Sequence, residues 1–277
     1  MAINPVLQEI VEYRGVEGLV AAKVLTDDDA NGYTTDEPFA IAGVAEISKS
    51  TDSSNEAHYY DNMPAIVVSS TSADELTINV SAIPLDILAL MTGQNYDSVT
   101  GSLIEGPRDF NYFALGYITK KTNGDEVYVW RYKGTFNIPD QTNATEDDGT
   151  DANGQEITYT GISTTHKFAK TGKGAKAINV DVAKDLADVS AFFDQVTTPD
   201  ALTAKTHYTL SLTQAQDTTL TVKRGSETLA NNATVNAGDV LKITCTGGTI
   251  TVNGTDFISG DMHVVTGNTT VISTKSA

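Results

Sequence analysis

The residues that could do chemistry in this 277-residue chain are few and widely spaced. The histidines are His58, His166, His207 and His263, and none has the spacing of a zinc ligand pair. The single cysteine, Cys245, lies in an apolar strand pattern, so a small buried hydrophobe is favoured over a nucleophile. No Gly-x-Ser-x-Gly turn or phosphate-binding glycine loop is present. We therefore expect no enzymatic activity and no cofactor.

One acidic segment has the spacing of a metal site. Asp27, Asp29 and Asn31 stand at alternate positions before Gly32, which matches the first half of a calcium-binding loop. The twelfth position of such a loop carries a bidentate glutamate, but here it is Pro38. The flanking residues are predicted to be strands rather than helices. A solvated hairpin loop is therefore favoured over a calcium site.

The charge of the chain is strongly acidic and unevenly distributed. The net charge is −18, and residues 1–200 hold 13 Lys and Arg against 31 Asp and Glu, whereas residues 201–277 hold five of each. An acidic surface repels nucleic acid, although simple solubility also explains such a charge. No segment approaches the run of about 18 apolar residues that spans a membrane, and residues 1–14 lack a signal-peptide pattern. No membrane partner is expected.

Residues 112–136 predict a long β-hairpin. Asn123-Gly124 lies between two apolar and aromatic runs, and this pair favours a two-residue type I′ loop. That loop would place Tyr117 opposite Trp130. The side chains then expected on the core face are Leu115, Tyr117, Tyr128, Trp130 and Tyr132. The opposite face would carry Gly116, Ile118, Val129, Arg131 and Lys133.

Two polar segments and two helices are predicted in the rest of the first 200 residues. Residues 48–62 and 140–156 are predicted to be long polar loops, and the second contains six acids and no basic residue. Tyr59 and Tyr60, near the end of the first, could belong to a core or to an interface. Pro84 and Gly93 bound a short helix over residues 84–91. The apolar spacing over residues 181–196 predicts a longer amphipathic helix.

The composition changes after Pro199-Asp200, which predicts domains at 1–200 and 201–277. Eighteen of the last 77 residues are threonine, and no helical pattern occurs there. Short strands are predicted at 208–212, 218–223, 240–246, 249–252, 262–265 and 269–273, with turns at Gly238-Asp239 and Gly260-Asp261. Many short strands at this spacing favour a small immunoglobulin-like β-sandwich.

The hairpin resembles part of a known family. Tyr112–Tyr117, Lys120–Gly124 and Tyr128–Phe136 are similar to the main hairpin of the major tail proteins, or tail tube proteins, of long-tailed bacteriophages. Weaker similarity extends to Ala42–Ile47, Ser53–Asn62 and Ala191–Asp194. The resemblance covers residues 1–200. Residues 201–277 are similar, in composition, to the immunoglobulin-like modules fused to phage tail and capsid proteins.

The resemblance implies a mainly β protein. Residues 1–200 would form a tail-tube β-sandwich or barrel with a packed α-helix, and residues 201–277 an immunoglobulin-like β-sandwich. The chain would be a structural virion protein whose six-membered rings stack into the tail tube, the conduit for DNA ejection. Assembly would take place in the host cytoplasm around a tape-measure protein. The tail terminator and distal tail proteins would be further partners, and DNA would pass without specific binding.

The resemblance also implies a self-assembly surface. The residues expected in it are Ser53, Tyr59, Tyr60, Asp61, Gly116, Ile118, Val129, Arg131, Lys133, Asp147 and Asp148. The second hairpin face would then line the lumen or contact neighbouring subunits. A surface-binding adhesin, whose C-terminal immunoglobulin-like domain binds carbohydrate, is the alternative; such a protein would be expected to carry a secretion signal or a wall anchor.

Overall fold

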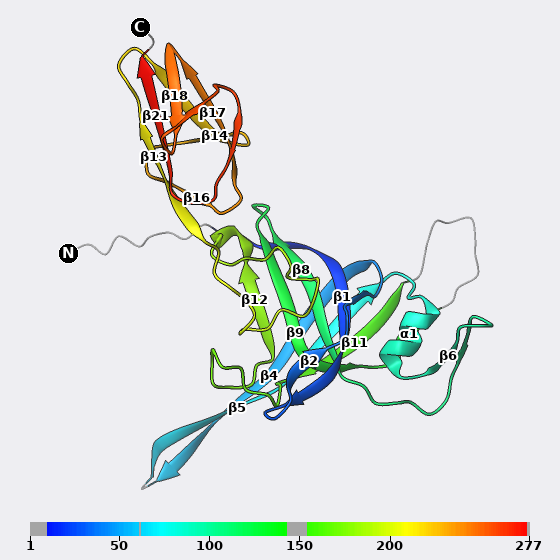
Figure 1. Cartoon of the computed structure of the whole chain (residues 1–277). Helices are drawn as coiled ribbons and strands as arrows, with labels where there is room; N and C mark the ends of the chain where they lie inside the picture. Colours follow the sequence, from blue (N-terminus) through cyan, green and yellow to red (C-terminus); the bar gives the residue numbers. More distant parts are fainter. Residues whose placement is uncertain (1–9, 61, 143–153, 276–277) are drawn as a thin grey trace. The chain divides into compact units, whose positions relative to one another are not determined.

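The computed structural model describes residues 10–60, 62–142 and 154–275, and the chain is mainly β (Figure 1). It divides into two compact units, Met1–Thr203 and Ala204–Ala277. The division lies three residues beyond the boundary expected from composition. Each unit has its own hydrophobic core.

A ten-stranded sheet forms most of the first unit. Its main path runs β2-β1-β8-β9-β11-β5-β4, and its strands are antiparallel. The strands on this path are β1 (Tyr13–Asp28), β2 (Gly32–Thr35), β4 (Val44–Tyr60), β5 (Met63–Val80), β8 (Phe113–Lys121), β9 (Glu126–Phe136) and β11 (Gln155–Ile162). The short strands β3 (Phe39–Ala40), β10 (Asp140–Gln141) and β12 (Ala177–Asp181) pair with β1, β11 and β9. The sheet curls, so that β1 and β4 lie close together without pairing.

The part of the sheet around β8 and β9 is buried on both faces. One core cluster lies inside the curl and includes Leu76, Leu115, Val129 and Tyr159. The other cluster lies on the opposite face and includes Ala114, Trp130, Tyr132, Phe168 and Phe192. The second cluster is covered by the irregular chain after β11 and after β12, rather than by a helix.

The helix predicted after Pro84 is confirmed as α1 (Leu85–Thr92). Pro84 precedes it, and Gly93 ends it in the left-handed conformation with a φ of 70° and an N–H donated to the Ala89 carbonyl. A side chain at Gly93 would clash with the Asp109 carbonyl oxygen, so this position requires glycine for two reasons. The small hairpin of β6 (Asn95–Asp97) and β7 (Ser102–Ile104) follows.

The longer helix predicted over 181–196 is wrong. Only a single 3₁₀ turn, η1 (Val182–Lys184), forms there, and Asp185 ends it with a φ of 52°. Asp188 accepts hydrogen bonds from the N–H and hydroxyl of Ser190, so acidic and hydroxyl side chains bind local backbone in place of a helical ladder. Phe192 is nevertheless buried against the sheet, so the apolar spacing identified a packing segment but not its conformation.

The hairpin of β8 and β9 is confirmed, but its predicted register is wrong by one residue. Of Asn123 and Gly124, only Gly124 has a positive φ, of 90°. Its N–H donates to the Lys121 carbonyl at 3.0 Å. Lys121 in turn donates to the Asp125 carbonyl, so the loop has three residues and ends in a glycine bulge. Trp130 therefore lies opposite Gly116, not Tyr117. A Cβ at Gly116 would lie 2.9 Å from the indole, so glycine makes room for the ring.

The second unit, beginning at Ala204, consists of two sheets around one core. The first has the order β16-β13-β21-β18-β19, with β13 and β21 parallel, and the second has the order β15-β14-β17-β20. Their bounds are β13 (His207–Thr213), β14 (Thr219–Arg224), β15 (Glu227–Leu229), β16 (Ala233–Asn236), β17 (Val240–Thr246), β18 (Gly248–Val252), β19 (Thr255–Phe257), β20 (Met262–Val264) and β21 (Thr269–Lys275). All six predicted strands are present, and Cys245 is buried in this core.

Candidate interaction surface

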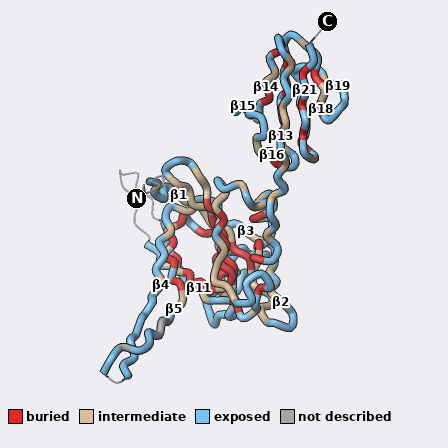
Figure 2. Tube along the Cα trace, turned by 90° about the vertical axis from the view of Figure 1, so that its left-hand side faces the viewer, coloured by how far each residue is buried: buried red, intermediate tan, exposed pale blue. Residues whose placement is uncertain are grey.

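The segment predicted as a polar loop at 48–62 is instead half of a long hairpin arm. From Ser53 to Tyr60, β4 pairs with the Met63–Thr71 part of β5. The next strand, β11, pairs with β5 only as far as Asp74, so the arm is two-stranded. We define the β4–β5 arm as residues 52–72. Every arm residue whose exposure is described is exposed, and the arm extends beyond the rest of the sheet (Figures 1 and 2). A two-stranded hairpin without a buried face is marginally stable in water.

The end of the arm is apolar. Tyr59, Tyr60, Met63, Ile66 and Val67 expose 51–68% of their surface. They flank Asn62, which takes a positive φ of 63°. Contiguous exposed apolar side chains mark interaction sites in soluble proteins.

The outer edge of β4 adds hydrogen-bonding capacity to this surface. Among the described residues, β4 pairs with β5 only, and it is the last strand on the main path of the sheet. A strand of 17 residues with an unpaired edge can accept a strand from another chain. β4 contains one lysine, Lys49, and no proline, so it has few of the residues that protect edges in monomers.

The arm contains some of the residues predicted for self-assembly. Ser53, Tyr59 and Tyr60 lie on it and are exposed. Asp61, Asp147 and Asp148, which were also predicted, lie outside the described residues. Sequence reasoning missed Met63, Ile66 and Val67. The apolar run that directly follows Asn62 was the signal that could have identified them.

The prediction that the second face of the β8–β9 hairpin is an exposed surface is wrong. Gly116, Val129 and Arg131 are buried inside the first unit. Ile118 and Lys133 are only half-buried. The error has two causes: the three-residue loop changes which side chains share a face, and both faces of the hairpin are covered.

Arg131 belongs to a buried ionic cluster around one carboxylate. Its Nη1 donates to Asp74 Oδ2 at 2.6 Å, and its Nε donates to the Tyr117 hydroxyl. Lys176 Nζ donates to Asp74 Oδ1 at 3.1 Å, and Lys49 Nζ lies 3.8 Å from Oδ2. Burial alone would raise the pKa of Asp74, but the hydrogen bonds from Lys176, Thr51 and Arg131 lower it below its usual value. Three cations thus surround one acid.

The calcium-like segment is a structural hairpin turn. Asp27 accepts hydrogen bonds from the backbone N–H groups of Thr165 and His166 and from Lys133 Nζ. Asp29 accepts from the Lys167 N–H. These bonds attach the chain after β11 to the β1–β2 turn and occupy the carboxylates. Burial opposes the ionised form of Asp27, yet the bonds from Lys133 and the two backbone donors lower the pKa of its carboxyl.

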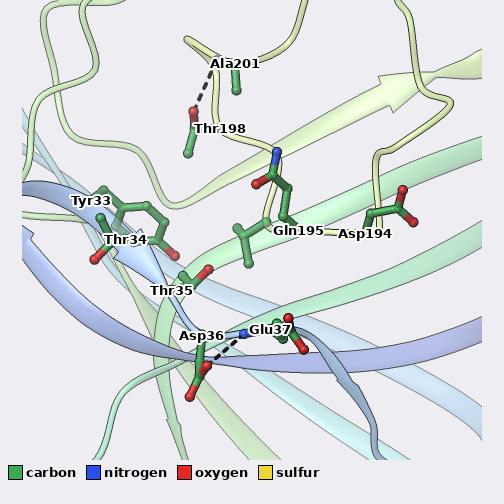
Figure 3. Close-up of a pocket in the computed structure, with 10 residues that line it drawn as sticks. Tyr33, Thr34, Thr35, Asp36, Glu37, Asp194, Gln195, Thr198 and Ala201 are labelled. Atoms are coloured by element: carbon green, nitrogen blue, oxygen red, sulfur yellow. Dashed lines mark hydrogen bonds between the residues drawn. The ribbon is translucent and has the colours of Figure 1, made fainter.

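A cavity of about 520 Å³ beside β2 is lined by three carboxylates and no basic residue (Figure 3). Asp36, Glu37 and Asp194 contribute them, and Tyr33 forms part of the wall. The Asp36 carboxylate accepts a hydrogen bond from the N–H of Glu37. Within the described ranges, no group of three or more His, Cys, Asp or Glu side chains is placed to hold a metal ion. The cavity therefore has no metal-binding arrangement.

None of the helices in the described part of the chain has the length and apolar character needed to cross a membrane. The sequence matches no model of a known protein family, and no curated protein is found to match it.

Proposed function

We propose that this protein is the subunit of a phage tail tube and that the β4–β5 arm joins one subunit to the next. The first unit would be the tail-tube domain, and copies of it would form rings, six-membered by resemblance, that stack into the conduit for DNA. The second unit would be an immunoglobulin-like domain on the tube. The tape-measure, tail terminator and distal tail proteins would be the further partners.

The observation that carries the proposal is the exposure of the arm. Ser53–Tyr60 of β4, paired with the Met63–Thr71 part of β5, extend from the domain with no buried side chain of their own among those described. If a second subunit covered Tyr59, Met63 and Ile66, their apolar surface would be removed from water, which is favourable. An arm of this kind gains its stability from a partner, which is the behaviour expected of a joint in a polymer.

The outer edge of β4, which pairs with no other strand in the described part of the chain, and the charge of the first unit support the same proposal. Backbone groups along the edge can continue a sheet into a neighbouring subunit, which would protect an otherwise aggregation-prone edge. The acidic excess, which lies wholly in residues 1–200, would keep a conduit from binding the polyanion that passes through it. The hairpin resemblance at residues 112–136 supplies the family.

Electron microscopy of the purified chain tests this proposal. We expect rings or tubes in negative stain. A variant in which residues 52–73 are replaced by Asn-Gly joins Thr51 to its facing partner Asp74 through a two-residue loop, so the domain should fold. Trp130 fluorescence should report the same buried environment in both proteins, because the indole is fully buried on β9, which pairs with neither strand of the arm.

The shortened variant should remain unassembled. Two point substitutions make the same test with a smaller change. Tyr59→Ser removes an aromatic side chain from the arm, and its control, Tyr96→Ser, removes an exposed tyrosine from β6. We expect the first to impair tube formation and the second to leave it intact. A chain that stays monomeric at every concentration, or an arm-less variant that assembles as well as the full chain, would rule the proposal out.

A further inference from the structure

We propose that the cavity between β1, β4 and β9 binds a small carboxylate that carries an apolar chain. This cavity is separate from the arm, and its assignment does not depend on the tail-tube proposal. It lies beside the inner core of the curled sheet, and β1 and β4 line it without pairing with each other. Proteins bind small ligands in clefts that have a mostly apolar lining and a few polar groups.

The size and lining of the cavity suit an amphipathic ligand. Its volume is about 600 Å³, within the range of about 300–1,000 Å³ that small-molecule sites occupy. The apolar part of the wall is formed by Val16, Ile47, Val127 and Val129, which come from three different strands. An alkyl chain placed there would leave water and contact side chains already packed against the core.

The polar part of the wall is cationic. Lys49 and Arg131 both line the cavity, and Tyr117 and Asn179 add a hydroxyl and an amide. Glu46 is the one acid in the lining. Behind the wall, Asp74 is shared by Arg131, Lys49 and Lys176, so these groups together with Glu46 comprise three cations and two acids, an excess of one positive charge.

This local excess is unusual in a chain with a net charge of −18. Arg131 is itself 5% exposed, so its charge is held in a region where water screens it weakly. A ligand carboxylate near Lys49 would reduce the unbalanced charge. A cationic or neutral ligand of the same shape would not.

The strand geometry keeps the cavity open. β1 has register shifts on its β8 side between Tyr13 and Val16 and between Glu17 and Val20. Gly18, within the second of these shifts, takes a positive φ of 67°. Such bulges bend a strand and end its pairing, and they are enriched next to functional sites. Here they curve β1 beside β4, and the two strands line the cavity without forming a ladder.

Isothermal titration calorimetry of the full chain with sodium octanoate tests the assignment. We expect one site per chain with a Kd of about 1 mM or tighter. Acetate, which lacks the alkyl chain, and octylammonium, which reverses the charge, should bind far more weakly. Octanoate that binds no more tightly than octylammonium, or no detectable octanoate binding, would overturn the proposal.

Two substitutions locate the site, and both are at exposed or half-exposed positions that should tolerate change. Lys49→Gln should weaken octanoate by about threefold to fivefold, the effect of one partly exposed charge. Asn179→Trp should block the mouth and abolish binding. Lys242→Gln, which removes an exposed lysine from the second unit, is the matched control and should change nothing. Equal effects of Lys49→Gln and Lys242→Gln would place the ligand elsewhere and overturn the assignment.

Discussion

The β8–β9 hairpin and the β4–β5 arm are built alike and are used in opposite ways. Both are long antiparallel pairs joined by short turns. Trp130 and Leu115, on opposite faces of the first hairpin, are both fully buried, whereas Tyr59 and Val67 on the arm are about two-thirds exposed. The comparison shows that pairing alone does not decide whether a hairpin stabilises its own domain. What covers its faces does.

The largest expected difference between the two hairpins is in how much stability the first unit loses when a tyrosine is replaced by alanine. Tyr132 is fully buried and donates its hydroxyl to the Thr197 carbonyl, so Tyr132→Ala should lower the free energy of unfolding of the first unit by about 3–5 kcal/mol. Tyr59→Ala should change it by less than about 0.5 kcal/mol. Denaturant titrations followed by the fluorescence of Trp130, the single tryptophan, report on this unit alone. Similar losses in both variants would contradict the comparison.

A smaller and pH-dependent difference is expected from the ionic cluster under β9. Asp74→Asn should destabilise the first unit by about 3 kcal/mol at pH 7, because it leaves Arg131 and Lys176 without their charged partner. The pKa of the Asp74 carboxyl is lowered in the folded protein, so its stabilising contribution is complete above the ordinary value of 3.8 and is lost as the pH falls through the folded-state pKa.

The gap between wild type and Asp74→Asn should therefore narrow below pH 4. The same fluorescence titrations, repeated between pH 7 and pH 3, measure it. Asp27→Asn serves as a reference, since the pKa of the Asp27 carboxyl is also lowered but through different partners, Lys133 and the backbone N–H groups of Thr165 and His166. A gap for Asp74→Asn that stays constant with pH would show that its ionisation does not stabilise the fold.

The difference between the hairpins also explains which parts of the fold the sequence predicted. The second unit has strands with one buried and one exposed face, so its alternation of apolar and polar residues is clear, and six of its strands were predicted. The arm has no buried face, so Ser53 to Asn62 show no such alternation and were predicted as a loop. Pairing that depends on hydrogen bonds without burial leaves little trace in composition.

The hairpin β8–β9 was predicted, but its register was not. Asn123-Gly124 favours a two-residue loop locally, and the structure instead uses a bulge at Gly124. The clearance between Gly116 and the Trp130 ring is a tertiary feature that is consistent with the observed register. Turn propensity could not reveal it. The buried position of Trp130 was nevertheless predicted correctly, because aromatic enrichment does not depend on the register.

The candidate site was predicted only in part for the same reason. Tyr59 and Tyr60 were identified because paired aromatics at the end of a polar segment are unusual in any local structure. Arg131 was assigned to an exposed face from period-two alternation, which cannot show that a sheet is covered on both sides. Its partner Asp74 lies 57 residues away in the chain, and no spacing rule connects them.

Hydrogen exchange of assembled and unassembled protein tests the central claim most directly, because it reads both hairpins in one experiment. In unassembled chains, amides of Ser53–Tyr60 should exchange quickly and those of Glu126–Phe136 slowly, since only β9 is buried. On assembly the arm should become protected by at least about tenfold while β9 changes little. Arm amides that exchange equally fast in both states would contradict the account.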